Sequence, residues 1–435
     1  MRPDTIYAIS SGRGVAGVAV IRLSGPDSRG AIEAMTAKPA PAARRAVLRS
    51  LIHPETAEPL DLALVLWLPG PASATGEDMA EFHVHGGLAV IEGVLAALAR
   101  LPGLRPAEPG AFTRRAFDNG ELDLTRVEGL GDLLAAETQA QRRQALQQLG
   151  GRLERLYEGW RDRLVRTMAY VAADLDFAEG EDDVPAGLPT AVRQDLAGLS
   201  QEIEAHLNDS GRGERLRQGL TVAITGAPNA GKSSLVNWLA GRDVAIVSPY
   251  AGTTRDTIEV HLNLGGYPVT VIDTAGLRET HDPIEREGIA RARTRAAAAD
   301  LVVHLSAPDA AEEAPPASGA PIWRYINKAD LLAAAQGNAI SVTQGQGMDD
   351  FVARLTGFAA SQMPQGDAPM LTRARHRQHL EACRSELIAA QSRDDDPVLQ
   401  AEHLRRAAQA LGALTGRIDI EDLLDVIFRE FCIGK

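Results

Sequence analysis

The sequence predicts a multidomain protein that combines α/β and all-α folds: an N-terminal α/β domain, a helical domain, and a second α/β domain inserted into the helical one. The chain has 435 residues, enough for about three domains of ordinary size. Apolar residues recur every three or four positions from Leu146 to Leu175, which predicts a long amphipathic helix. Between this helical block and another near the C-terminus, strand patterns alternate with helix patterns from about 216 to 360.

The first predicted domain spans residues 1–118. Short β-type runs occur at Gly17–Leu23, Leu62–Leu68 and Glu81–Val84, and a helical pattern occurs at Leu88–Arg100. Glycine and proline separate these runs, as expected for a small α/β domain. The range has no recognisable catalytic triad or metal-binding pattern, so we interpret it as a domain for binding and self-association.

The helical domain is predicted in two parts, residues 119–215 and 366–435. Because the apolar stripe at Leu146–Leu175 must be buried, it needs helical partners. Candidates are helices at Arg375–Gln391 and Val398–Leu411, and a last helix starting near Asp419. Asp396 is predicted to cap the second of these, with Pro397 as its first residue.

Composition and charge exclude several classes of function. The formal net charge is −13, so the chain lacks the positive field that captures nucleic acid, and any RNA contact is local or shared with a partner. No apolar run approaches the roughly twenty residues of a membrane span, and no signal-peptide pattern is present. Two cysteines, Cys383 and Cys432, provide neither a zinc knuckle nor a disulfide framework. We expect a soluble, cytoplasmic protein without a membrane partner.

A phosphate-binding loop is predicted in the inserted domain, residues 216–365. The β-branched run Thr221–Thr225 leads into GAPNAGKS, a complete GxxxxGKS motif, and a helical pattern follows at Ser234–Leu239. In this context backbone N–H groups surround the β-phosphate, Lys232 contacts the β- and γ-phosphates, and Ser233 ligates Mg²⁺. The nucleotide-contacting candidates in this loop are Asn229, Ala230, Gly231, Lys232, Ser233 and Ser234.

Two further motifs follow in the order typical of nucleotide-dependent switches. In the GTTRD segment, residues 252–256, the hydroxyl of Thr254 can reach the same Mg²⁺. After an apolar strand at residues 269–272, the carboxylate of Asp273 can hold Mg²⁺ through water, and the N–H of Gly276 can meet the γ-phosphate. The candidates in this second motif are Asp273, Thr274, Ala275 and Gly276.

The choice of base is predicted from Asn327-Lys328-Ala329-Asp330, which follows a strand-like run at Ile322–Ile326. A carboxylate at Asp330 can accept both N1–H and N2–H of guanine, whereas adenine offers neither donor. Base-supporting contacts are expected from Ser341, Val342 and Thr343. The ordered motifs predict a Ras-like P-loop GTPase domain, here called the G domain. Its low-complexity stretch APDAAEEAPPASGAP is predicted to be a solvated loop.

The sequence also indicates how GTP is hydrolysed. Leu277 stands where Ras-like proteins carry the glutamine that orients the attacking water, and leucine cannot bind water. The amide oxygen of Asn229, beside the phosphates, could help bind a monovalent cation in place of an arginine finger. The alternative is that Asn229 only stabilises the turn after Pro228.

Several motifs recur together in one known family. They are Gly76-Glu77-Asp78, His85-Gly86-Gly87, Ala116-Phe117, Pro228-Asn229, the GTTRD and DTAGL segments, and the terminal Phe431-Cys432-Ile433-Gly434-Lys435. With a G domain inserted into a helical domain, the chain resembles the MnmE (TrmE) family of tRNA modification GTPases over essentially its whole length.

This resemblance implies a function. Such proteins act with the flavoprotein MnmG (GidA) to add a carboxymethylaminomethyl or aminomethyl group to C5 of the wobble uridine of certain tRNAs. A 5-formyl- or methylene-tetrahydrofolate supplies the one-carbon unit, and GTP, Mg²⁺ and K⁺ are the other cofactors. The resemblance also implies a homodimer with folate at or near the interface of the N-terminal domains, and tRNA held through the complex.

Roles for individual residues are also implied by the resemblance. Asn229 corresponds to a potassium ligand, with main-chain oxygens of Ser248, Tyr250 and Thr253 completing the cage. Glu285 corresponds to the glutamate that orients the catalytic water; without the resemblance it would be interpreted as an exposed helix residue.

The implied folate contacts are Arg22, Glu81 and Lys435. Glu121 also stands at a folate-contacting position, where the family carries a basic residue, but a carboxylate there cannot pair with the glutamate tail of folate. Cys432 is a candidate nucleophile, and a buried or redox-neutral cysteine is the alternative.

A second function class remains open from the sequence: a regulatory GTP switch, such as a ribosome-assembly GTPase, with no covalent chemistry on RNA. Such proteins usually carry an RNA-binding module with a basic or aromatic surface. This chain has instead the N-terminal domain and the terminal Cys-Ile-Gly-Lys.

Overall fold

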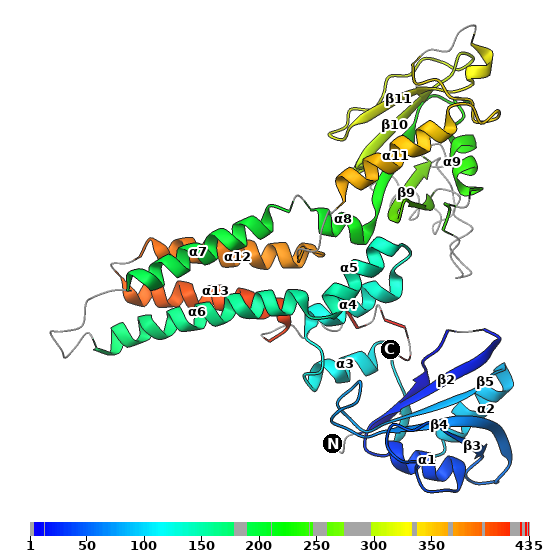
Figure 1. Cartoon of the computed structure of the whole chain (residues 1–435), viewed down its shortest axis with the longest axis vertical. Helices are drawn as coiled ribbons and strands as arrows, with labels where there is room; N and C mark the ends of the chain where they lie inside the picture. The colour runs from blue at the N-terminus through cyan, green and yellow to red at the C-terminus, as the bar shows by residue number, and fades with distance from the viewer. Residues whose placement is uncertain are drawn as a thin grey trace, which may run out of the picture. The chain divides into compact units, whose positions relative to one another are not determined.

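The computed structural model describes residues 4–12, 14–177, 189–209, 211–242, 244–246, 259–273, 297–332, 337–363, 369–393, 396–417, 427–428, 431–432 and 434. The chain divides into two compact units (Figure 1). The first, here called the terminal unit, comprises Met1–Gly131, Leu149–Tyr157 and Gly412–Lys435. The second, the central unit, comprises Asp132–Gln148 and Glu158–Leu411.

The terminal unit contains a six-stranded sheet of order β3-β4-β5-β2-β1-β6. Its strands are β1 (Thr5–Ile9), β2 (Ala16–Ser24), β3 (Val47–Ile52), β4 (Pro59–Leu68), β5 (Met79–Gly86) and β6 (Leu104–Pro106). The pair β1–β6 is parallel and the other pairs are antiparallel. The helices α1 (Ser28–Thr36) and α2 (Leu88–Leu98) pack on one face, over a core that includes Ile21, Val65 and Phe82 (Figure 1). The strands and the helix predicted in this range are therefore confirmed.

The opposite face of this sheet is covered over β1 by α3 (Ala111–Asp118), where Phe112 packs with Ile6 and Ala8. Side chains alternate between the faces of a strand, so residues next to the buried ones point to this second face. Arg22 and Glu81 are direct cross-strand partners there, on β2 and β5. The polar side chains on β2 and β5 thus share one face of the sheet.

Both ends of the chain contribute to the terminal unit. Leu124 and Val127 on α4 (Leu124–Ala135) form a small core with Phe428 and Phe431. A last helix is predicted to start near Asp419; residues 418–426 lie outside the described residues, and residues 427–428 are helical.

The prediction of one continuous helix from Leu146 to Leu175 is wrong. The structure has two helices, α5 (Gln139–Leu149) and α6 (Arg152–Phe177), with Gly150 and Gly151 between them. Gly151 has φ +77°, a left-handed conformation that side chains disfavour, so the helix ends although the apolar spacing continues.

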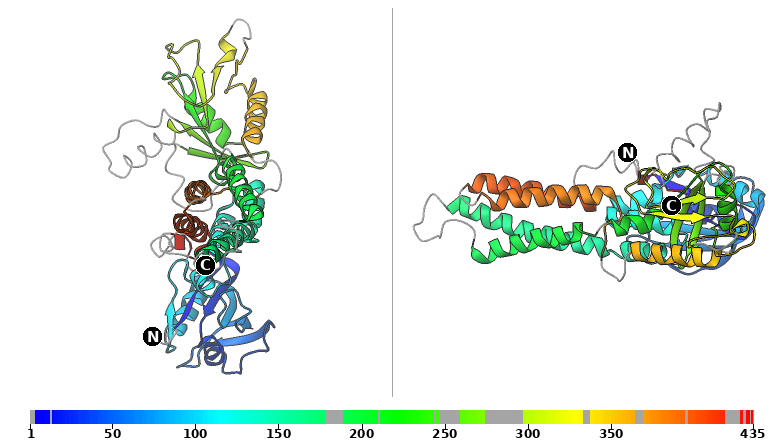
Figure 2. Two further views of the ribbon diagram at one scale, coloured as in Figure 1. Left: turned by 90° about the vertical axis from the view of Figure 1, so that its left-hand side faces the viewer. Right: turned by 90° about the horizontal axis from the view of Figure 1, so that it is seen from above.

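In the central unit α6 lies beside α13 (Pro397–Thr415), and α7 (Thr190–Leu207) lies beside α12 (Ala374–Gln391) (Figures 1 and 2). Trp160 on α6 donates from Nε1 to Glu202 of α7 at 3.0 Å. The two C-terminal helices agree with the sequence prediction, and Oδ1 of Asp396 accepts a hydrogen bond from the N–H of Leu399 at 3.0 Å, which confirms the predicted cap. Within the described part of the chain, no helix has the length and apolar character needed to cross a membrane.

The G domain contains a five-stranded sheet of order β11-β10-β7-β9-β8. Its strands are β7 (Leu220–Thr225), β8 (Glu259–Leu264), β9 (Tyr267–Asp273), β10 (Leu301–Ser306) and β11 (Ile322–Ile326), with α8 (Arg212–Gln218) before β7. Strand β8 is antiparallel to β9, and the other pairs are parallel. The helices α9 (Lys232–Ala240) and α11 (Met348–Gln362) bury their apolar residues against the sheet. Because parallel strands end at one edge, the carboxyl ends of β7, β9, β10 and β11 lie together there.

Candidate functional site

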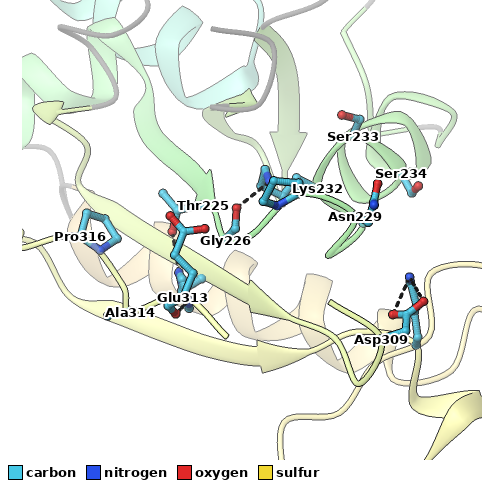
Figure 3. Close-up of a pocket in the computed structure, with 14 residues that line it drawn as sticks. Thr225, Gly226, Asn229, Lys232, Ser233, Ser234, Asp309, Glu313, Ala314 and Pro316 are labelled. Carbon is cyan, nitrogen blue, oxygen red and sulfur yellow. Dashed lines mark hydrogen bonds and ion pairs between the residues drawn. The ribbon is translucent and has the colours of Figure 1, made fainter. Parts of the chain in front are cut away.

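A pocket of about 930 Å³ lies at the carboxyl edge of the G-domain sheet (Figure 3). The loop after β7, the first turn of α9 and the segments after β10 and β11 form its walls. Its lining residues are Thr225, Gly226, Pro228, Asn229, Gly231, Lys232, Ser233, Ser234, His304, Asp309, Glu313, Ala314, Pro316 and Lys328.

The side chain of Lys232 lies inside this pocket, with only 7% of the residue exposed. Its Nζ donates to the carbonyl oxygens of Gly226 and Ala227, at 2.6 and 2.8 Å. An ammonium group has three hydrogens, so a third remains for an anion at the amino end of α9. A helix amino terminus with a buried lysine is well suited to phosphate groups.

The phosphate loop is held against the base motif by a side-chain hydrogen bond. Asn327, buried at 3% exposure, donates from Nδ2 to the carbonyl oxygen of Ala230 at 2.9 Å. Gly231 has φ +92°, and a Cβ there would lie 2.0 Å from that same Nδ2. Only glycine at position 231 permits this contact.

A hydroxyl and a carboxylate meet beside the phosphate loop. Ser233 Oγ donates to Asp273 Oδ2 at 2.6 Å, which joins the start of α9 to the end of β9. Oxygen ligands of these two kinds are the ones that Mg²⁺ prefers, so the residues present fit this ion.

The base motif has its own support. The exposed carboxylate of Asp330 accepts a hydrogen bond from the buried Ser341 hydroxyl, and Ser341 Oγ lies 3.3 Å from Thr343 Oγ1. The N–H of Val342 donates to Oδ1 of Asn327 at 3.3 Å. The loop at 341–343 therefore orients the carboxylate and amide groups of the motif at 327–330.

A second polar cluster lies on the open sheet face of the terminal unit. Arg22 donates from Nε to Glu81 Oε1 at 3.0 Å, and the other oxygen of Glu81 lies 3.0 Å from Nε2 of His83. Burial alone would raise the pKa of Glu81, but the hydrogen bond with His83 and the charge of Arg22 outweigh it and lower the pKa. Glu81 is therefore an ionised hydrogen-bond acceptor, and 15% of its side chain is exposed. Leu64, which pairs with His83 and lies on the same face, is 43% exposed, so this face of the sheet is open.

The C-terminal segment reaches the same sheet. Gly434 lies directly against the carbonyl of Ile9 at the end of β1, so close that a Cβ at residue 434 would overlap that oxygen. Ile9 pairs with Ile21, the neighbour of Arg22. Cys432, two residues before Gly434, is exposed and forms no disulfide.

Comparisons with known proteins agree with this architecture. The family description "MnmE helical domain" matches residues 124–432, and "GTP-binding protein TrmE N-terminus" matches residues 5–121. The chain is 52% identical over 442 residues to the tRNA modification GTPase MnmE of Parvibaculum lavamentivorans, covering 99% of this chain and 100% of that protein. The chain belongs to the MnmE family of tRNA modification GTPases. The protein of that name from a Bradyrhizobium species is 51% identical, and the match covers 99% of this chain and 99% of that protein. The one from Rhodospirillum rubrum is 50% identical, and the match covers all of both chains.

Several residues singled out from the nucleotide motifs or from the resemblance to the MnmE family lie outside the described residues. They are Ser248, Tyr250, Thr253, Thr254, Thr274, Ala275, Gly276, Glu285 and Lys435. The potassium cage and the water-orienting glutamate accordingly stay predictions. Asn229, the remaining cage residue, has φ +65° and lines the pocket.

The structure also locates the other predicted positions of this MnmE family member. Glu121 is exposed just beyond α3, where its backbone oxygen accepts a hydrogen bond from Arg126 at 3.0 Å. Ser234 lines the nucleotide pocket beside Ser233. No cluster of three or more metal-ligating His, Cys, Asp or Glu side chains occurs among the residues that are described.

The residues that sequence reasoning missed include His83, Asp309 and Glu313. His83 could have been found, because it lies two positions after Glu81 on one strand and therefore on the same face. Asp309 and Glu313 line the nucleotide pocket, although we predicted their segment only as a solvated loop. No residue pattern in that segment indicates such a position.

Proposed function

We propose that this member of the MnmE family is a potassium-dependent GTP hydrolase that acts with the flavoprotein MnmG (GidA) on C5 of the wobble uridine of certain tRNAs. The product is a carboxymethylaminomethyl or aminomethyl group, built with a tetrahydrofolate-derived one-carbon unit. One observation carries the proposal: a chain matched over its whole length by MnmE proteins has both a nucleotide pocket and a separate polar cluster on its terminal unit.

The nucleotide roles follow from the chemistry of the pocket. Loop N–H groups at 229–234 and the ammonium of Lys232 bind the phosphates, and the carboxylate of Asp330 accepts the N–H groups of guanine. Mg²⁺ would be held by Ser233 and Thr254, with Asp273 acting through water, and would neutralise charge on the phosphate oxygens.

Turnover needs two more groups. Because Leu277 cannot orient water, we assign this role to Glu285. Asn229, with main-chain oxygens of Ser248, Tyr250 and Thr253, would hold K⁺ where other GTPases insert an arginine finger. The support from the fold is that Asn229 lies on the phosphate loop at the pocket.

The folate derivative would bind the open face of the terminal-unit sheet. A carboxylate such as Glu81 can accept N–H groups of an aminated heterocycle, and a guanidinium such as Arg22 suits a ligand with carboxylates. Lys435 follows Gly434, which lies against β1, and would add a further positive charge. Glu121 would approach the ligand without pairing with its tail, and Cys432 is the candidate nucleophile of this region.

The partners follow from charge and family. With a net charge of −13, this chain would leave most tRNA phosphate contacts to MnmG in the complex. We propose a cytoplasmic homodimer formed through the terminal units. Light scattering of the full chain should show twice the mass of one chain, and a monomer at high concentration would contradict the dimer.

The experiment that tests the proposal uses a strain in which this gene is deleted. Mass spectrometry of its tRNA should show wobble uridines without the C5 group, and the intact gene should restore it. The Lys232→Ala and Glu81→Gln variants should fail to restore it, for lack of nucleotide binding and folate binding respectively. Unchanged wobble nucleosides in the deletion strain would exclude the modification function and favour a regulatory GTP switch.

A further inference from the structure

The segment after β10, residues 307–316, forms a wall of the nucleotide pocket. Most of its residues are exposed, as a solvated loop would be. Asp309, Glu313, Ala314 and Pro316 nevertheless line the pocket together with the phosphate loop (Figure 3). Unpaired carboxylates beside a site for an anionic ligand would repel that ligand, so the position of this acidic segment needs an explanation.

One reason is that the Asp309 carboxylate is paired. Both of its oxygens accept hydrogen bonds from Nζ of Lys328, at 2.7 and 2.6 Å. Lys328 belongs to the guanine motif and also lines the pocket. It has φ +59°, an uncommon conformation for a residue with a side chain, and its carbonyl oxygen accepts a hydrogen bond from the N–H of Leu331 at 2.9 Å.

The segment is also anchored at a second point. His304, on β10 with 5% exposure, lies 3.1 Å from the hydroxyl of Thr225 through Nδ1 and 2.9 Å from the carbonyl oxygen of Glu313 through Nε2. A carbonyl oxygen only accepts, so Nε2 carries the proton and, in the neutral ring, Nδ1 accepts from the Thr225 hydroxyl. The imidazole thus fastens the acidic segment to the strand that leads into the phosphate loop.

We propose that Asp309 is a positioning residue for guanine nucleotides, which acts by holding the Lys328 side chain in its place at the edge of the pocket. This inference rests on the proposed function, in which the motif at 327–330 that contains Lys328 binds guanine nucleotides. A free lysine side chain loses rotamer entropy when a ligand orders it, whereas a lysine already held by Asp309 loses less. The paired ammonium also has little net charge to offer a phosphate. We therefore expect the pairing to raise the affinity for the guanosine part of the nucleotide, which GDP and GTP share.

The test measures nucleotide dissociation constants of the full chain by titration with GDP and with a non-hydrolysable GTP analogue. Asp309→Asn should raise both constants by about two- to fivefold, the range of a half-exposed ion pair, and by the same factor. Asp309→Glu should restore most of the affinity. The matched control is Glu312→Gln, which removes one acidic charge from the same segment at a residue that does not line the pocket. It should leave both constants unchanged.

A double-mutant cycle with Lys328→Met decides whether Asp309 acts through the lysine. In the Lys328→Met background, Asp309→Asn should have no further effect on either constant. An equal effect in both backgrounds, or a loss also seen with Glu312→Gln, would overturn the proposal in favour of a general charge effect. If Lys328→Met itself leaves nucleotide affinity unchanged, the role proposed for Lys328 fails. If Lys328→Met weakens nucleotide binding but Asp309→Asn leaves both dissociation constants unchanged, the inference about Asp309 fails while the role of Lys328 stands.

Discussion

The side chain of Asn327 is hydrogen bonded to the backbone of Ala230, with 2.9 Å between Nδ2 and the carbonyl oxygen. Residues 97 positions apart in the sequence thereby join the guanine motif to the phosphate loop. The other end of the same amide accepts the N–H of Val342. One buried side chain thus connects three loops of the nucleotide site, so a change in it should affect both stability and binding.

Asn327→Ala should destabilise the G domain by about 1–3 kcal/mol, because it leaves the buried N–H of Val342 without its acceptor. Guanine nucleotide affinity should fall as well. Denaturant unfolding and nucleotide titration measure the two effects. Asn338→Ala is the matched control: its amide also donates to a backbone oxygen, that of Arg324, but in an exposed position. A loss of stability as large as that of Asn327→Ala in this control would contradict our interpretation.

Gly231→Ala should abolish nucleotide binding, because the new methyl group would overlap the amide of Asn327 at 2.0 Å in a backbone conformation unfavourable to alanine. Titration with GDP measures the loss. Gly319→Ala provides the comparison, since no atom lies within 4 Å of the position its Cβ would occupy. That variant should bind GDP as the parent does, and its free energy of unfolding should lie within about 0.5 kcal/mol of the parent's.

Asp330→Asn should shift the base preference from guanine to xanthine nucleotides, because the amide replaces one acceptor of guanine N–H groups with a donor. Each lost hydrogen bond to the charged carboxylate corresponds to about 1.5–3 kcal/mol. Competition between GTP and XTP for the variant measures the shift. Equal preference in the variant and the parent would show that Asp330 does not recognise the base.

GTP hydrolysis should be much faster in KCl than in NaCl at equal ionic strength, because a bound K⁺ would stand in for an arginine finger, which contributes about 10³–10⁵ in rate. Asn229→Gly should remove the dependence on K⁺, while it keeps the left-handed backbone that Asn229 adopts at φ +65°. Steady-state rates in both salts provide the measurement. Equal rates for the parent would reject the potassium mechanism.

Glu285→Ala separates nucleotide binding from water activation. This variant should still bind a non-hydrolysable GTP analogue in a titration but lose K⁺-stimulated turnover in steady-state assays. Turnover at the parent's rate would remove Glu285 from the catalytic role.

Asp123 should make stability depend on pH. Burial raises the pKa of this carboxyl, which caps α4 through the N–H of Arg126, to about 6 from its ordinary 3.8. The folded state therefore holds this proton more tightly than the unfolded state, and the contribution to stability decreases as the pH rises from about 4 to about 6. Asp123→Asn cannot ionise, so it should be more stable than the parent above this range, by up to about 3 kcal/mol, and similar below it.

Chemical denaturation on either side of this pH range tests the prediction for Asp123. Asp162→Asn, at an exposed position of α6, is the control and should show no comparable gain at high pH. A difference between Asp123→Asn and the parent that does not vary with pH would contradict the assignment to Asp123.

The sequence by itself determined the nucleotide motifs and their order along the chain. A strand, a glycine-rich loop and a helix at 220–240 form from local patterns, and the cap at Asp396 depends only on neighbouring residues. The fold class and the family could be predicted for the same reason: these signals are contiguous in the chain.

Only the tertiary structure decided which distant residues support those motifs. Asn327 reaches Ala230, and Asp309 reaches Lys328, because parallel strands end at one edge of a sheet. Apolar spacing alone predicted one helix through Gly151, because hydrophobic periodicity carries no information on which residue adopts a left-handed backbone conformation and ends a helix. Contacts between residues far apart in the chain depend on strand order and register, and single-sequence patterns do not encode these two properties locally.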